Sequence, residues 1–161
     1  MKTYGLIGKS LGHSFSPGFF NSFFEEHGIQ AQYKLIELDS IERVKPILDG
    51  ACHGLNVTIP YKEEIIPFLD ELSPEAKAIG AVNTIVFSEG KAIGFNTDAF
   101  GFQQSIKPFL TFEHERALIL GTGGSSKAVA YVLRNLGIQV NFLSRKQPSG
   151  QQFSYEQVNE A

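Results

Sequence analysis

Residues 54–62, with the sequence GLNVTIPYK, decide how the rest of the chain can be arranged. Apolar and polar residues alternate from Leu55 to Ile59, so this stretch is predicted to form a short strand with one apolar face. Pro60 has no N–H group and cannot extend a central strand ladder, so the strand is expected to end there. Lys62 therefore lies just past the carboxyl end of the strand, at the edge where open α/β sheets bind ligands.

Three polar side chains of this stretch, Asn56, Thr58 and Lys62, are expected at one crevice of the sheet. They offer an amide, a hydroxyl and an ammonium group, which together suit a polar small molecule. On this stretch alone, an ordinary strand end with a solvated lysine is the alternative interpretation.

Composition restricts the classes of protein to which the chain can belong. Its 161 residues include 14 basic and 17 acidic side chains, with a formal charge of −3 and no basic run, which argues against a nucleic-acid partner. Cys52 is the single cysteine, so no internal disulfide can form and a reducing cytoplasm is the expected location. No signal peptide is expected at the start of the sequence, and no apolar run approaches the ~20 residues of a membrane span. The four histidines lack metal-ligand spacing, so no metal site is expected.

Strand and helix patterns alternate through the first part of the chain. Strands are predicted at 3–8, 33–38 and 55–59, helices at 17–27, 41–48 and 74–79, and a hairpin at 81–87 and 91–96. A further helical stretch is predicted around 63–68, interrupted by Pro67. Strands that alternate with helices of this length are typical of βαβ units. The fold class is therefore predicted to be α/β, with a mainly parallel sheet.

The loop after the first predicted strand leads into a helix and presents two hydroxyl groups. Ser16 is expected to cap this helix, with Pro17 at its first position. Ser14 and Ser16 also bracket the turn, so their hydroxyls can reach a ligand at its mouth. Four aromatic residues at helical spacing are predicted to be core: Phe19, Phe20, Phe23 and Phe24.

Polar side chains also occur at the start of one hairpin arm and after the end of the other. Antiparallel pairing would bring Asn83 close to the run NTD at 96–98. Asp98 precedes a helical pattern at 100–110, where a carboxylate favours the helix N-terminus. A role for Asp98 as a helix cap alone is therefore the alternative to a role in a site.

The segment 116–143 has the order strand, glycine turn, helix, strand that is typical of a dinucleotide-binding fold. Within the turn, GTGGS at 121–125, Gly121 permits the tight bend and Gly123 lets the backbone approach a pyrophosphate. The second strand is followed by SRK at 144–146, with no acidic residue for the ribose hydroxyls of NAD. Basic residues suit a 2′-phosphate, so NADP is the predicted cofactor.

Together these motifs resemble those of the shikimate dehydrogenase family, from one end of the chain to the other. The segments that carry the resemblance are SFS at 14–16, NVTIPYK at 56–62, GAVNT at 80–84, NTD at 96–98 and GTGGS at 121–125. The resemblance implies reversible, NADPH-dependent reduction of 3-dehydroshikimate to shikimate in aromatic amino-acid biosynthesis.

The resemblance also implies roles for individual residues, with Lys62 as the general acid/base and Asp98 as its partner. The residues implied to bind the substrate are Ser14, Ser16, Asn56, Thr58, Lys62, Asn83 and Asp98. Those implied to bind NADP(H) are Gly121, Thr122, Gly123, Gly124, Ser125, Ser144, Arg145 and Lys146. A substrate domain at 1–99 would be followed by the first part of a Rossmann-like NADP-binding domain at 100–161, in a cytoplasmic monomer or homodimer.

The sequence departs from the family in two respects. The usual Asn-Arg-Thr phosphate clamp reads SRK here, and the family is much longer, so we expect the chain to be a fragment that is poorly active by itself. One alternative is a quinate/shikimate dehydrogenase that uses NAD, against which Ser16 and Arg145 argue. Another is a module that binds the substrate without turning it over.

Overall fold

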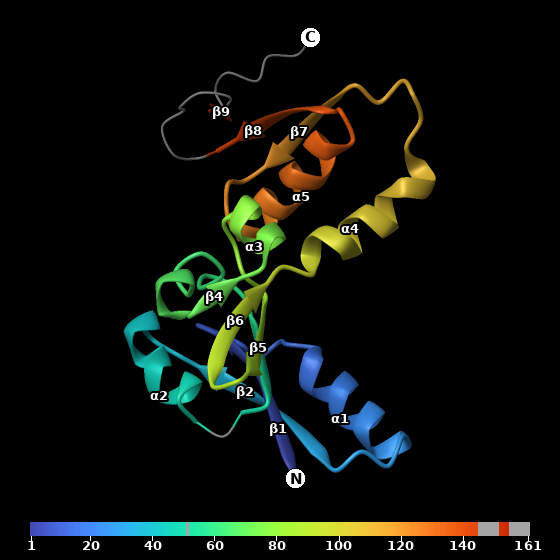
Figure 1. Ribbon diagram of the computed structural model, residues 1–161. Coiled ribbons are helices and arrows are strands. Elements are labelled where there is room, and N and C mark those ends of the chain that lie inside the picture. Colours follow the sequence, from blue (N-terminus) through green and yellow to red (C-terminus); the bar gives the residue numbers. More distant parts are fainter. Residues whose placement is uncertain (51, 145–151, 155–161) are drawn as a thin grey trace.

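The computed structural model describes residues 1–50, 52–144 and 152–154, whose strands form a six-stranded and a three-stranded sheet (Figure 1). The elements of the first part are β1 (Lys2–Gly8), α1 (Ser16–Glu26), β2 (Ala31–Glu37), the 3-10 helix η1 (Ile41–Val44), α2 (Lys45–Leu48), β3 (Gly54–Val57), η2 (Ile66–Phe68), β4 (Glu71–Leu72), α3 (Pro74–Ile79), β5 (Thr84–Ser88) and β6 (Lys91–Phe95). Those of the second part are α4 (Asp98–Ile106), η3 (Lys107–Phe109), β7 (Arg116–Leu120), α5 (Gly124–Asn135), β8 (Gln139–Leu143) and β9 (Gln152–Phe153).

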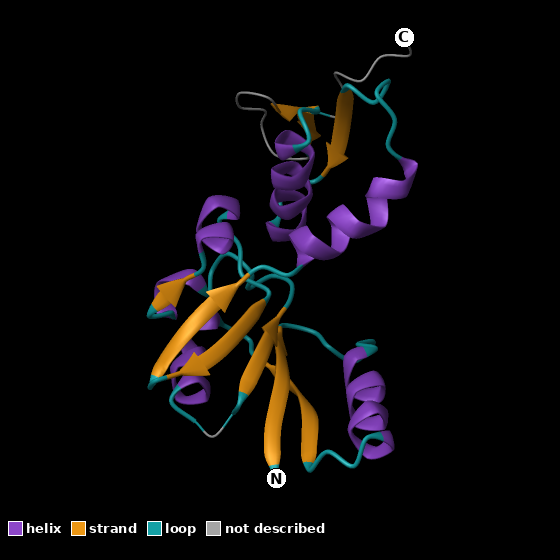
Figure 2. Ribbon diagram, turned by 45° about the vertical axis from the view of Figure 1, so that its right-hand side comes forward, coloured by secondary structure: helices purple, strands orange, loops and turns teal. Residues whose placement is uncertain are grey.

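The larger sheet has the strand order β2-β1-β3-β5-β6-β4 and is mainly parallel, as predicted. Only β5 runs against its neighbours β3 and β6, with which it pairs in antiparallel register. Helices α1 and α2 lie on opposite sides of this sheet (Figures 1 and 2). The carboxyl ends of β1 and β3 meet at one edge, so the loops that follow Gly8 and Val57 are neighbours.

The smaller sheet joins β7, β8 and β9 in parallel, and α5 connects the first two strands. This is the predicted order of strand, glycine turn, helix and strand. Strand β9 starts at Gln152. The N–H of Gly121 donates to the carbonyl of Leu143 (2.8 Å), which ties the glycine turn to the end of β8.

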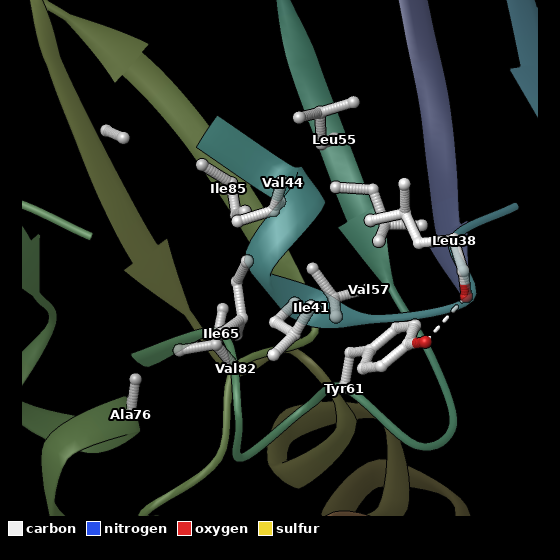
Figure 3. Packing of buried hydrophobic residues seen from close by; sticks show 12 residues of the cluster. Leu38, Ile41, Val44, Leu55, Val57, Tyr61, Ile65, Ala76, Val82 and Ile85 are labelled. Carbon is white, nitrogen blue, oxygen red and sulfur yellow. Dashed lines mark hydrogen bonds between the residues drawn. The ribbon is translucent and has the colours of Figure 1, made fainter. Parts of the chain in front are cut away.

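Buried side chains from the sheet, η1 and the segment after β3 form the main core (Figure 3). Tyr61 belongs to this cluster and is only 2% exposed. Its hydroxyl donates to the carbonyl of Leu38 (2.6 Å), which satisfies the one polar atom that the ring brings into the core. Burial also raises the pKa of the Tyr61 hydroxyl, because it disfavours the charged form. The residue before Lys62 is thus fixed in the core.

Two helices differ from their predictions. The stretch 63–68, which Pro67 was expected to interrupt, consists of turns at 63–65 followed by η2, so its first part is not helical. The side chain of Ser16 makes no capping hydrogen bond, and Phe15 occupies the N-cap position of α1. Instead, the Ser14 hydroxyl accepts from the N–H of Ser16 (3.3 Å), so the cap lies two residues earlier.

The aromatic residues of α1 are also less buried than predicted. Phe19 and Phe23 are 51% and 39% exposed, whereas Phe20 and Phe24 are half-buried and pack near Tyr33 and Tyr4. The two pairs point in directions about 100° apart, because successive helical residues turn by that angle. The sheet covers one pair only.

Candidate active site

A cavity of about 420 Å³ lies at the edge of the larger sheet, beyond the carboxyl ends of β1 and β3. All seven residues predicted to bind the substrate line it: Ser14, Ser16, Asn56, Thr58, Lys62, Asn83 and Asp98. Ser10 and His13 also line the cavity and were not among the predicted residues. Hydroxyl and amide groups dominate its polar lining, which suits a ligand that carries several hydroxyls.

Lys62 and Asp98 form an ion pair at this cavity. The Lys62 Nζ donates to Asp98 Oδ2 at 2.7 Å, and the two side chains are 13% and 32% exposed. Asp98 is the first residue of α4, but its two carboxylate oxygens accept from Lys62 and Asn83, so a role as a helix cap alone does not account for its contacts. A largely buried ammonium beside a carboxylate is an arrangement that can hold and deliver a proton.

The backbone around Lys62 is fixed on both sides. Tyr61 is anchored in the core, and its N–H donates to the carbonyl of Thr58 (2.9 Å). The N–H of Val82 donates to the carbonyl of Lys62 (2.7 Å). Only the side chain of Lys62 is left to reach toward the cavity.

Asn83 holds Asp98 in place from the hairpin. Its Nδ2 donates to Asp98 Oδ1 (2.8 Å) and to the hydroxyl of Thr97 (2.9 Å), and its Oδ1 accepts from the N–H of Thr97 (2.9 Å). The prediction that the hairpin brings Asn83 close to the run 96–98 is therefore confirmed. Asp98 accepts from an amide through one oxygen and from Lys62 through the other, so both oxygens are fixed.

Tyr33 contacts a residue that lines the cavity. It was not among the predicted site residues, because in the sequence it reads as one residue of a strand. Its hydroxyl donates to Asn56 Oδ1 (2.8 Å), and the Asn56 Nδ2 donates to the carbonyl of Asn83 (3.3 Å). Burial raises the pKa of Tyr33 to about 12, and a hydrogen bond with Ser16 opposes this shift in part. A chain of hydrogen bonds thus joins Ser16, Tyr33, Asn56 and Asn83.

Glu37 supports the loop that carries the two serines. The carboxylate of Glu37 at the end of β2 accepts from the N–H of Leu11 (2.6 Å), and Leu11 itself is buried. The carbonyl of Leu11 in turn accepts from the N–H of Ser14 (2.8 Å). These bonds hold Ser14 against the cavity.

The glycine turn fits the phosphate groups of a dinucleotide. Gly121 has a φ of +104°, a conformation that favours glycine. A Cβ at Gly123 would meet no atom within 4 Å, so open space lies over the backbone there. Helix α5 begins at Gly124 with no acidic residue in its first turn, and its first N–H groups have no acceptor within the helix.

Ser144, another residue predicted to bind NADP(H), follows the end of β8. Ser144 is 5% exposed, and its N–H donates to the carbonyl of Phe153 (2.9 Å). Arg145 and Lys146 lie outside the described residues.

Comparison with known proteins decides the family. Residues 6–85 match the family described as shikimate dehydrogenase substrate binding domain. The NADP(+) shikimate dehydrogenase of Pyrococcus abyssi is 44% identical over 140 residues, which span 84% of this chain and 52% of that protein. The chain belongs to the shikimate dehydrogenase family.

Solved structures of the shikimate dehydrogenase family have the same fold. The structure of shikimate dehydrogenase 1 from Peptoclostridium difficile aligns with a TM-score of 0.86 at 41% identity, over 97% of this chain and 61% of that one. The Thermus thermophilus enzyme, solved in complex with NADP(H) and shikimate, aligns with a TM-score of 0.77 at 36% identity, over 90% of this chain and 56% of that one. The chain thus spans little more than half the length of these relatives.

None of the helices in the described part of the chain is long and apolar enough to cross a membrane. Residues 1–50, 52–144 and 152–154 also contain no group of three or more His, Cys, Asp or Glu side chains that could hold a metal ion.

Proposed function

We propose that the full-length protein is an NADP-dependent shikimate dehydrogenase that interconverts 3-dehydroshikimate and shikimate. The observation that carries this proposal is the Lys62–Asp98 pair, with Nζ and Oδ2 2.7 Å apart, in a cavity lined by hydroxyl and amide groups. Relatives named for this reaction, one of them solved with NADP(H) and shikimate, support it.

Lys62 is the proton donor of the proposed reaction. Reduction of a ketone builds negative charge on its oxygen, and a nearby ammonium can stabilise that charge and donate the proton. Asp98 keeps the ammonium at the cavity, and Asn83 keeps Asp98 in place. In the reverse direction the amine accepts the proton of the substrate hydroxyl.

The remaining lining residues orient the substrate. Ser14, Ser16 and Thr58 offer hydroxyls that can donate to a carboxylate or exchange hydrogen bonds with substrate hydroxyls. The side chains of Asn56 and Asn83 already form several hydrogen bonds with neighbouring residues. These two residues can therefore contact the substrate only through the atoms that face the cavity. Several weak polar contacts of this kind fix one orientation of a rigid ring.

The cofactor would be held by the glycine turn and the residues after β8. We assign the pyrophosphate to Gly121, Thr122, Gly123, Gly124 and Ser125, and the 2′-phosphate to Ser144, Arg145 and Lys146. Bound NADPH would supply the hydride that the chain itself cannot provide. We further propose that residues 1–99 form the substrate-binding and catalytic domain, and that 100–161 form the first part of the NADP-binding domain.

The test is an assay of NADP⁺ reduction by the full-length protein, with shikimate and quinate as substrates and NAD⁺ as the alternative cofactor. We expect rapid reduction with shikimate and NADP⁺ and little with the other combinations. Faster reduction of NAD⁺ with quinate than of NADP⁺ with shikimate would favour the quinate/shikimate dehydrogenase. No reduction in any combination would reject an oxidoreductase. The 161-residue chain should bind shikimate weakly and turn it over poorly.

We also place the protein in the cytoplasm, as a monomer or a homodimer.

A further inference from the structure

The side chain of Lys62 has a second partner, which comes from the glycine turn. Its Nζ donates to the hydroxyl of Ser125 at 3.2 Å, in addition to Asp98 at 2.7 Å. Ser125 lies in the first turn of α5, 63 positions away in the sequence. An ammonium has three N–H donors, so these two bonds set the direction of the third.

Two further contacts hold this part of α5 against the segment that carries Lys62. A Cβ at Gly124 would approach the Cβ of Lys62 to 2.9 Å and that of Ala81 to 3.3 Å, so only glycine allows this spacing without a shift. Glu63, which follows Lys62, forms an ion pair with Lys127, which lies two residues after Ser125. The contacts of Gly124 and Lys127 therefore hold Ser125 next to Lys62.

The chemistry of a helix N-terminus makes a hydroxyl necessary at this place. The first turn of a helix carries partial positive charge and exposes N–H donors, which is an unfavourable neighbour for an ammonium. A serine hydroxyl offers lone pairs and can accept from Nζ, whereas an alanine would leave the ammonium with no acceptor on the side of the helix end. The side chain of Ser125 can serve Lys62 while its backbone N–H stays available to a phosphate of the cofactor.

We propose that Ser125 is a positioning residue for Lys62, and that it links the glycine turn of the cofactor site to the proton donor of the substrate site. This proposal rests on the proposed function. It assigns the Ser125 hydroxyl to Lys62 and leaves only the Ser125 backbone for the cofactor. If the hydroxyl instead served the cofactor, its loss would weaken NADP⁺ binding and would not depend on Lys62.

The experiment uses Ser125→Ala, Ser125→Thr and a control, Ser105→Ala, in the full-length protein. Ser105 is an exposed residue of α4 whose hydroxyl donates to the carbonyl of Phe102 within the same helix. Ser125→Ala should lower kcat by about 10–100-fold, the order expected for one hydrogen bond to a charged group. The KM for shikimate and the calorimetric Kd for NADP⁺ should change less than about twofold, which is small beside the expected change in kcat. Ser125→Thr should restore most of the rate, and Ser105→Ala should leave it unchanged.

A double-mutant cycle with Lys62→Met separates positioning from a general structural effect. In the Lys62→Met background, Ser125→Ala should cause no further loss of kcat, because there is no ammonium left to position. An unchanged kcat in Ser125→Ala, or an equal loss with and without Lys62, would overturn the proposal.

A comparison of crystal structures without ligands gives a readout that does not depend on turnover. The Lys62 side chain should move away from its place beside Asp98 in Ser125→Ala and stay there in Ser105→Ala. An unmoved Lys62 would also overturn the proposal. If the wild-type protein failed to oxidise shikimate at all, the proposed function would be wrong, and this structural comparison would still decide the role of Ser125.

Discussion

The Nζ of Lys62 lies 2.7 Å from Oδ2 of Asp98, although the two residues are 36 positions apart in the sequence. The sheet creates this proximity, because Lys62 follows the end of β3 and Asp98 follows the end of β6, on the other side of β5. Both side chains are largely withdrawn from water, at 13% and 32% exposure, so the pair is in place before a substrate arrives. Preorganised charges of this kind cost no rearrangement during the reaction.

Lys62→Met should lower kcat of the full-length protein by about 10²–10⁴-fold, the range for loss of a positioned proton donor. Methionine keeps most of the length of the side chain and removes its charge and its proton. The Kd for shikimate should change less than kcat, because the hydroxyls of Ser14, Ser16 and Thr58 remain. Steady-state kinetics and calorimetry check this, with the exposed Lys77→Met as a control. A normal kcat with a raised KM would make Lys62 a substrate clamp and not the acid/base.

Asp98→Asn should also lower kcat, because the amide is neutral and no longer pairs with the ammonium of Lys62. The loss in the double variant Lys62→Met, Asp98→Asn should be smaller than the product of the two single losses, since the residues act as one unit. Rates for the four proteins of the cycle provide the measurement. Strictly multiplicative losses would show that the two groups act independently.

Tyr33→Phe should change how stability depends on pH. The pKa of Tyr33 is raised from its ordinary 10 to about 12 by burial. Because the unfolded state then loses its proton first, the stability from Tyr33 is complete below pH 10 and is lost as the pH rises toward 12. In that window the free energy of unfolding should fall by up to about 1.4 kcal/mol per pH unit on account of this group.

The measurement is urea unfolding of wild type and variant across the alkaline range. At neutral pH, Tyr33→Phe should be less stable by about 1–2 kcal/mol, because Asn56 loses the hydrogen bond that Tyr33 donates. The difference between the two proteins should then narrow as the pH rises, since phenylalanine has no proton to lose. A constant difference at every pH would mean that Tyr33 titrates alike in the folded and unfolded states.

How much could be predicted from the sequence depends on whether a feature is local. Strand β3 and helix α3 follow from neighbouring residues, and both were predicted. Strands β4 and β9 have two residues each, which is too short for any periodicity to show. The pattern of α1 groups its phenylalanines into faces, but only the packed structure decides that Phe19 and Phe23 are the exposed pair.

The same distinction holds for the candidate site. The seven lining residues were found because short motifs carry them, and parallel strands bring those motifs to one edge. Tyr33 acts on Asn56 across a long sequence separation, so no local pattern marks it. The glycine motif marks Ser125 for the cofactor, but its contact with Lys62 is also long-range and was not predicted. Such contacts depend on how the sheets and helices pack.

Arg145→Ala in the full-length protein should raise the KM for NADP⁺ much more than that for shikimate. The basis is the sequence alone, because Arg145 follows the second strand of the cofactor fold and a guanidinium can hold a phosphate through two hydrogen bonds. Arg43→Ala is a suitable control, since its side chain is 72% exposed and lies in η1. An unchanged affinity for NADP⁺ would place the 2′-phosphate elsewhere and remove the main reason to prefer NADP.

Gly123→Ala and Gly124→Ala form a matched pair, because adjacent glycines meet different surroundings. Gly123 has an extended backbone, with φ −80° and ψ 179°, and a Cβ there would meet no atom within 4 Å. Alanine should therefore fold without strain and add up to about 0.4–1 kcal/mol of stability by restricting the unfolded chain. If the pyrophosphate approaches this backbone, the Kd for NADP⁺ should nevertheless rise. An unchanged Kd would show that the space over Gly123 is not part of the cofactor site.

Gly124→Ala should have the opposite profile. Its Cβ would lie 2.9 Å from the Cβ of Lys62, and both atoms sit close to fixed backbone, so α5 must move away from Lys62. We expect a loss of about 1–3 kcal/mol in the free energy of unfolding, as for other overpacked contacts. We also expect a lower kcat, because the shift carries Ser125 away from Lys62. Urea unfolding and kinetics of both variants check this pair of predictions. A Gly124→Ala protein with wild-type stability and kcat would show that α5 and the Lys62 segment are not in tight contact in solution.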